Sequence, residues 1–311
     1  MCGIFGWSYS KRAGVPAMQR YALASTLALA NEARGDHSWG AADALTAEGW
    51  RGLGPVRGAP IGSFAERPAV MLHTRWATTG KVTLPNCHPL KHGPITLAHN
   101  GVIANHLLLA KRYGRTCDVD SQHIAIHLAE GLPLDELEGY GAIEWMDERL
   151  EPGTVRLCRF EEGDLSVRRV LTAKGQLVVW SSDRRHLRDA LRAAGFDKLE
   201  SEEVVLKDNA VYDVYRGEIY KTKTKLCITP RITSCWDDYW LSDGLDRSWK
   251  PLTGNQTKDR EDVARSLGLT QVDVDVWVDE SGVPIEVSEL DSLIEMENES
   301  MLEWIKKGGV Q

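Results

Sequence analysis

The sequence lacks the long apolar stretches that would place it in a membrane. No run approaches the roughly 18 consecutive apolar residues that a membrane-spanning helix needs. The apolar Cys2–Trp7 stretch is too short for a secretory signal peptide and has no basic leader. We therefore expect a cytoplasmic protein with no membrane partner.

An excess of basic residues is also missing. The formal net charge is −8, and residues 251–311 hold 14 Asp/Glu against 5 Lys/Arg, a local net of −9. The preceding 250 residues are close to neutral. A basic face that would attract nucleic acid is not evident, so no nucleic-acid partner is expected.

Close cysteine pairs and zinc-type spacings are absent as well. The six cysteines are scattered over the chain, at positions 2, 87, 117, 158, 227 and 235. This favours free thiols in a reducing compartment over a disulfide framework. The histidines between His88 and His127 do not follow the ligand spacings of known zinc motifs, so no metal site is expected.

Helical and strand patterns alternate along the first 220 residues. Helices are predicted over Pro16–Ala33, Val102–Tyr113, Ser121–Glu130 and from Ser182 to Ala194. Strands are predicted at Cys2–Trp7, Val70–Leu72, Ile95–Ala98, Val155–Arg159, Leu165–Leu171, Gln176–Trp180, Val204–Leu206, Val211–Tyr215 and Glu218–Tyr220. Sheets packed against helices, in a layered α/β arrangement, are the expected architecture.

The pattern changes after Lys221. The alternating Val272–Val278 segment predicts a strand that turns into a second one at Val283–Val287. Glu289–Lys307 has the apolar spacing of an amphipathic helix. We therefore predict a main domain at residues 1–221 and an acidic extension of unknown role at residues 222–311.

Cys2 can carry nucleophilic chemistry if Met1 is removed. It would then become the first residue and bear a free α-amino group. An α-amine with a pKa near 7.7–8.0 is partly neutral at pH 7 and can accept the thiol proton, so one residue supplies both nucleophile and base. By position alone, a small buried cysteine in a strand is the commoner explanation.

Polar clusters at strand ends supply the other groups that an acyl transfer requires. The amide of Asn100 and the N–H of Gly101 can stabilise an oxyanion. Arg75 suits the carboxylate of an amino acid, and Asp120 suits its ammonium group. These residue types point to an amide of an amino acid as substrate.

The chain resembles the class II glutamine amidotransferases, and within them the glutaminase domain of glucosamine-6-phosphate synthase. The resemblance covers residues 1 to about 221 and rests on six motifs in order: Cys-Gly-Ile-Phe-Gly, Arg-Gly-x-x-Ser-x-Gly, His-x-Arg-Trp-Ala-Thr-x-Gly, Asn-x-His-Pro, His-Asn-Gly and Asp-Ser/Thr-x-x-Ile. It implies an α+β fold, the four-layer αββα sandwich of the N-terminal-nucleophile (Ntn) hydrolases, followed here by a small C-terminal α/β extension.

The resemblance also implies a reaction. Cys2 would attack the glutamine side-chain amide through a glutamyl thioester, and Asn100 and Gly101 would form the oxyanion hole. Glutamate and ammonia would be released, without a metal or organic cofactor. Arg75 and Asp120 would hold the α-carboxylate and α-amino group of glutamine.

Three further residues receive roles from the resemblance. Trp76 and Thr78 would line the loop that folds over glutamine, and His88 would help to order the pocket. Thr79 and Gln122 depart from the residues that are usual in the family, and we interpret both as tuning changes.

The sequence does not show which part of a protein would accept the ammonia that glutamine hydrolysis releases. The C-terminal 90 residues are too few for the acceptor domains that usually follow in this family, so a synthetase or acceptor on a partner protein is expected. Two alternatives remain open: a stand-alone Ntn amidohydrolase that acts on another amide, and a non-catalytic module that binds glutamine for regulation.

Overall fold

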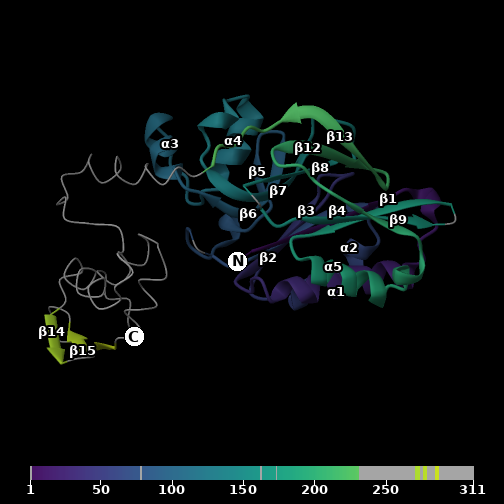
Figure 1. Ribbon diagram of the computed structural model, residues 1–311, viewed down its shortest axis with the longest axis horizontal. Coiled ribbons are helices and arrows are strands. Elements are labelled where there is room, and N and C mark those ends of the chain that lie inside the picture. Colours follow the sequence, from purple (N-terminus) through teal and green to yellow (C-terminus); the bar gives the residue numbers. More distant parts are fainter. Residues whose placement is uncertain are drawn as a thin grey trace. The chain divides into compact units, whose positions relative to one another are not determined.

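The computed structural model describes residues 2–77, 79–161, 163–172 and 174–230, and three short strands beyond residue 269 (Figure 1). The chain divides into two compact units, Met1–Ile232 and Thr233–Gln311. The first unit contains two antiparallel sheets and the helices that pack on them. A mixed α/β fold with two antiparallel sheets is therefore confirmed.

The larger sheet of the first unit has seven strands in the order β11-β9-β10-β1-β4-β2-β3. In this order the strands span Ser201–Val204, Ser166–Thr172, Gly175–Ser181, Gly3–Tyr9, Ala69–Arg75, Ser38–Asp43 and Gly49–Leu53. β1 is central and every residue of it is buried, as expected of a strand covered on both faces.

The smaller sheet has six strands in the order β13-β12-β8-β7-β6-β5. These strands span Glu218–Lys225, Ala210–Tyr215, Val155–Phe160, Gly139–Asp147, Ile95–Ile103 and Leu90–His92. β5 is the edge strand next to β6, just as β3 forms one edge of the larger sheet.

Five α-helices accompany the sheets of the first unit in the described residues. They are α1 (Ala17–Glu32), α2 (Ile61–Ala65), α3 (His106–Arg112), α4 (Gln122–Glu130) and α5 (Arg184–Ala193). Figure 1 shows α1 and α5 together along one side of the larger sheet, and α3 and α4 beside the smaller one. Short 3₁₀ turns lie at Lys11–Ala13, Val56–Gly58, Leu84–Asn86 (η3), Leu134–Glu136 and Phe196–Lys198.

Three clusters of buried apolar side chains hold the unit together. One joins α1 and α5 to the larger sheet, for example through Leu27 and Leu187. A second combines residues of both sheets, such as Met71 of β4 and Met146 of β7. The third packs the smaller sheet against α3 and α4 and includes Ile124.

The predicted helix over Pro16–Ala33 is confirmed, because α1 spans Ala17–Glu32. The prediction of a helix from Val102 is wrong in its first part. β6 continues to Ile103, which pairs with Gly139 of β7, and α3 begins only at His106. Strand pairing and a carboxylate bond to the Ile103 N–H hold the backbone extended there.

The second unit contains one described sheet, in the order β14-β15-β16, with strands Thr270–Asp273, Val276–Val278 and Pro284–Glu286. β15 pairs antiparallel with β16, so the predicted hairpin is confirmed. The prediction of one strand over Val272–Val278 is wrong, because β14 and β15 are themselves antiparallel neighbours. The helix predicted over Glu289–Lys307 lies outside the described residues.

Among the described residues, no helix is both long enough and apolar enough to cross a bilayer.

Candidate active site

Cys2 immediately precedes the central strand β1 and is half-buried. The pairing of Gly3 with Thr74 sets it beside the end of β4, where the Cys2 thiol contacts the Trp76 carbonyl oxygen at 3.4 Å. Burial raises the pKa of the Cys2 thiol, and the Trp76 contact and the charge of Arg75 only partly oppose this. The resting thiol is thus protonated, and a base must remove its proton before it attacks.

Arg75 ends β4 and is 2% exposed. Its guanidinium donates hydrogen bonds to the carbonyl oxygens of Thr79, at 2.5 Å, and Lys81, at 3.2 Å. Burial lowers the Arg75 pKa, while the neighbouring Cys2, Cys87 and Asp120 raise it. The structure therefore brings Arg75, Asp120 and Cys2 within electrostatic range of one another.

Asp120 lies just before α4 and is buried. One of its carboxylate oxygens accepts a hydrogen bond from the Ile103 N–H at 2.8 Å, which ties it to the end of β6. Its negative charge raises the pKa of the Cys2 thiol, opposite in sign to the effect of Arg75. A cationic amine bound near Asp120 would neutralise its charge and so remove its contribution to raising the pKa of the Cys2 thiol.

Asn100 and Gly101 lie on β6, paired with Ala142 and Gly141 of β7. The side-chain amide of Asn100 forms no hydrogen bond with another described residue, so its N–H groups are free to donate to a ligand. Gly101 admits no side chain, because a Cβ there would approach the Tyr140 carbonyl oxygen to 2.1 Å.

Three buried histidines join the sheets behind these residues. A ring nitrogen of His73 on β4 lies 3.2 Å from the His99 carbonyl oxygen on β6, and His99 lies 2.9 Å from the Ser121 hydroxyl. The His88 ring packs edge-on against His73 with centroids 4.3 Å apart. Burial lowers the pKa of His73 to about 3 and those of His88 and His99 below their usual range. These rings are therefore neutral at pH 7.

The structure describes two of the three residues that were predicted to line or order the glutamine pocket, Trp76 and His88. The Trp76 side chain is exposed and stacks on His37 with ring centroids 4.5 Å apart. His88 is buried, and neither of its ring nitrogens has a partner among the described residues. Thr78 lies outside the described residues. No cluster of three or more His, Cys, Asp or Glu side chains suited to a metal ion occurs in the described part of the chain.

Sequence reasoning missed one residue that contacts Cys2 directly. Arg34, in the turn after α1, donates a hydrogen bond from Nε to the Cys2 carbonyl oxygen at 2.9 Å. Its guanidinium lies 3.9 Å from the carboxylate of Asp183, the N-cap residue of α5. The Arg-Gly-x-x-Ser-x-Gly motif marked this arginine, but no pattern in the sequence indicated its partner.

Comparison with protein-family models gave no match for this chain. Curated relatives match a short segment of it. Glutamine–fructose-6-phosphate aminotransferase (isomerizing) of Legionella pneumophila is 47% identical over 62 residues, which cover 18% of this chain and 10% of that protein. The enzyme of the same name from Caulobacter vibrioides is 44% identical over 73 residues, covering 20% and 12%. The match thus spans about a tenth of the length of these relatives.

Solved structures match a larger part of the chain. The allosteric regulatory enzyme of purine biosynthesis superposes with a TM-score of 0.52 at 18% identity, covering 72% of this chain and 49% of that one. Glutamine phosphoribosylpyrophosphate amidotransferase from B. subtilis follows with a TM-score of 0.47 at 17% identity, with the same coverages.

The first superposition shows that the fold of this chain is similar to that of the purine-biosynthesis enzyme over the matched part. The resemblance to the class II glutamine amidotransferases is also confirmed: the curated relatives are glutamine-dependent enzymes of this class. The predicted enzyme class therefore agrees with that of the curated relatives to which the chain is similar.

Proposed function

We propose that this chain hydrolyses the side-chain amide of glutamine, with Cys2 as the nucleophile after removal of Met1. The observation that carries the proposal is the position of the Cys2 thiol before β1, in contact with the carbonyl oxygen of Trp76, which directly follows the buried Arg75. The charges of Arg75 and Asp120 both act on the pKa of this thiol. One cation and one anion beside a nucleophile match the carboxylate and ammonium groups of an amino-acid substrate.

The chemistry runs in two halves. The α-amine of Cys2 takes the thiol proton, and the thiolate sulfur bonds to the side-chain carbonyl carbon of glutamine. The oxyanion that forms accepts hydrogen bonds from the Asn100 amide and the Gly101 N–H. When it collapses, the carbon–nitrogen bond breaks, and the nitrogen takes the proton and leaves as ammonia. Water then hydrolyses the thioester to glutamate and restores the thiol.

The remaining site residues act on the substrate or on the loop above it. Arg75 holds the α-carboxylate, and its bonds to Thr79 and Lys81 support a second role in shaping the loop. Asp120 holds the α-amino group. We assign Trp76 and Thr78 to the loop over glutamine, and His88 to ordering the pocket through its contact with His73.

The finer architecture belongs to the same proposal. We propose the layer order αββα for the first unit, which is supported by one apolar cluster between the sheets and one on the outer side of each. The domain division near residue 221 and a cytoplasmic location remain predictions. Transfer of the ammonia to an acceptor on a partner protein is part of the same proposal.

Activity of a Cys2→Ala variant tests the proposal. Ammonia release from glutamine should fall below detection in Cys2→Ala and persist in the matched Cys117→Ala variant, whose cysteine is also half-buried. Activity that survives in Cys2→Ala would remove the nucleophile from the mechanism. Comparing glutamine with simple acyl-amides on the wild type tests the alternative of another amide substrate.

A further inference from the structure

None of the predicted site residues lines an open hollow of about 650 Å³. It is bordered by Gly49 and Arg51 of the edge strand β3 and by Lys91 of the edge strand β5. Its volume falls within the range of about 300–1,000 Å³ that is typical of small-molecule sites.

Apolar side chains form much of the wall. Leu84 and Pro85 of the η3 turn face it, together with Pro89. Leu84 remains 51% exposed. A ligand with an apolar body would take this surface out of water, which is favourable at roughly 25 cal/mol per Å².

Arg51 gives the hollow a positive charge in a fixed position. Its guanidinium donates a hydrogen bond to the Pro89 carbonyl oxygen, which holds it at the wall. No carboxylate among the described residues forms an ion pair with it. The protein atoms around it lower its pKa by partial desolvation. An anion beside the guanidinium would compensate that loss with charge-assisted hydrogen bonds.

Lys91 adds a second cation to the same wall. It pairs with Glu148 at 2.6 Å, but both side chains are about half exposed. Exposed pairs of this kind are weak, so Lys91 can turn toward a ligand at small cost. Among the described residues that line the hollow, none is acidic.

We propose that this hollow is a binding site for a small organic anion, with the apolar body on Leu84, Pro85 and Pro89 and the carboxylate or phosphate on Arg51. Lys91 provides the second positive charge. None of the residues that line it has a role in the proposed glutamine chemistry, and its occupation does not depend on Cys2.

Gly49 allows a test that leaves Arg51 in place. It is exposed, and a Cβ there would meet only the Ala41 carbonyl oxygen at 3.6 Å, an ordinary van der Waals contact. Gly49→Glu therefore adds a negative charge at the hollow without a steric conflict at its Cβ. Gly49→Gln adds the same volume without the charge, so the pair isolates the electrostatic effect.

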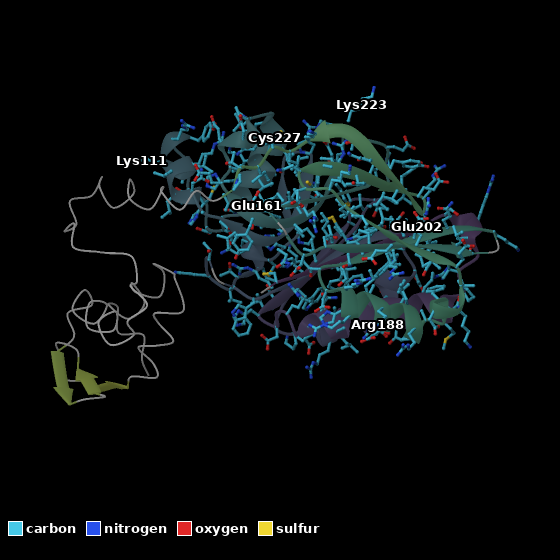
Figure 2. All side chains as sticks on the ribbon, in the orientation of Figure 1. Lys111, Glu161, Arg188, Glu202, Lys223 and Cys227 are labelled. Carbon is cyan, nitrogen blue, oxygen red and sulfur yellow. The ribbon has the colours of Figure 1, made fainter. Side chains whose placement is uncertain are left out.

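Titration calorimetry on the full chain, with phenyl phosphate and benzoate as probes, measures the binding. We expect saturable binding of at least one probe by the wild type and by Gly49→Gln. Gly49→Glu and Arg51→Met should weaken it by about tenfold or more. Arg188→Met is the control, because Arg188 lies on α5 (Figure 2), is 64% exposed and does not line the hollow.

The probes also identify the ligand's head group. Tighter binding of phenyl phosphate would indicate a phosphate ligand, and tighter binding of benzoate a carboxylate. If inorganic phosphate binds as tightly as phenyl phosphate, the apolar body contributes nothing to binding, and the proposal of an organic ligand is wrong. The proposal also fails if neither probe binds saturably, or if Gly49→Glu binds as tightly as Gly49→Gln.

Discussion

A protonated thiol reacts only after a base has taken its proton, so Cys2 needs a base beside it. Burial raises its pKa, and the Trp76 carbonyl and Arg75 charge reduce that rise only in part. The buried histidines behind the site are neutral and face one another, the backbone or the Ser121 hydroxyl. The α-amine that Met1 removal would expose therefore remains the base that the proposal requires.

Asp120 offers a test of substrate recognition at the same scale. Asp120→Asn keeps an oxygen that can accept the Ile103 N–H, so the fold should persist. It removes the charge for the substrate ammonium, and the KM for glutamine should rise by about tenfold or more. Steady-state kinetics measures this, and an unchanged KM would exclude Asp120 from substrate binding.

The titration of His123 on α4 should make the free energy of unfolding depend on pH. Burial lowers its pKa to about 4 in the folded chain, whereas an unfolded histidine titrates near 6.5. As the pH falls through this window the unfolded state binds the proton first, so stability is lost between about pH 6.5 and pH 4. His123→Phe should flatten this decline by up to about 1.4 kcal/mol per pH unit. Urea unfolding at several pH values measures the slope, which must differ between the two proteins.

At the scale of elements, the N-terminus of α5 connects a helix cap to the candidate site. Asp183 accepts a hydrogen bond from the Arg185 N–H at 2.7 Å, and its carboxylate lies 3.9 Å from Arg34. Asp183→Ala should lower the free energy of unfolding by about 1 kcal/mol through loss of the cap. Asp183→Asn is the control, because asparagine caps helices about as well. Equal stability of all three chains in urea would contradict the role of this cap.

The elements also show what sequence patterns could and could not predict. α1 is an Ala-rich segment that follows a proline, and β10 contains the apolar run Leu177–Trp180, so the sequence predicts both. β2 (Ser-Trp-Gly-Ala-Ala-Asp) was missed, because small residues have low strand propensity and its burial on both faces removes any alternation. The helix predicted at the end of β6 is wrong because this segment pairs with β7, a strand that comes much later in the sequence.

The residue types of the candidate site are visible in the sequence as short polar motifs. Cys2 and Arg75 stand at strand ends, whereas Asn100 lies within β6 and Asp120 precedes α4. The link from Arg34 to Cys2 and Asp183 was not predictable. It depends on three segments that approach only after α1 and α5 pack together.

At the scale of the whole molecule, the packing of the first unit continues past residue 221. Leu226 and Ile228 are buried in the cluster beneath α3 and α4, and Thr229 bridges to Glu138. Leu226→Ala should lower the free energy of unfolding by about 2–5 kcal/mol. Val205→Ala, at a side chain that is 80% exposed, should change it by less than about 0.5 kcal/mol. Similar effects of both substitutions in urea would place Leu226 outside the cooperative unit.

The central claim concerns one residue of this molecule, Cys2 with a free α-amine. A mass spectrum of the active chain, before and after reaction with the glutamine analogue 6-diazo-5-oxo-norleucine, tests it most directly. We predict a chain without Met1 that gains one adduct on Cys2, and no adduct in Cys2→Ala. An active chain that retains Met1, or an adduct on another residue, would contradict the account.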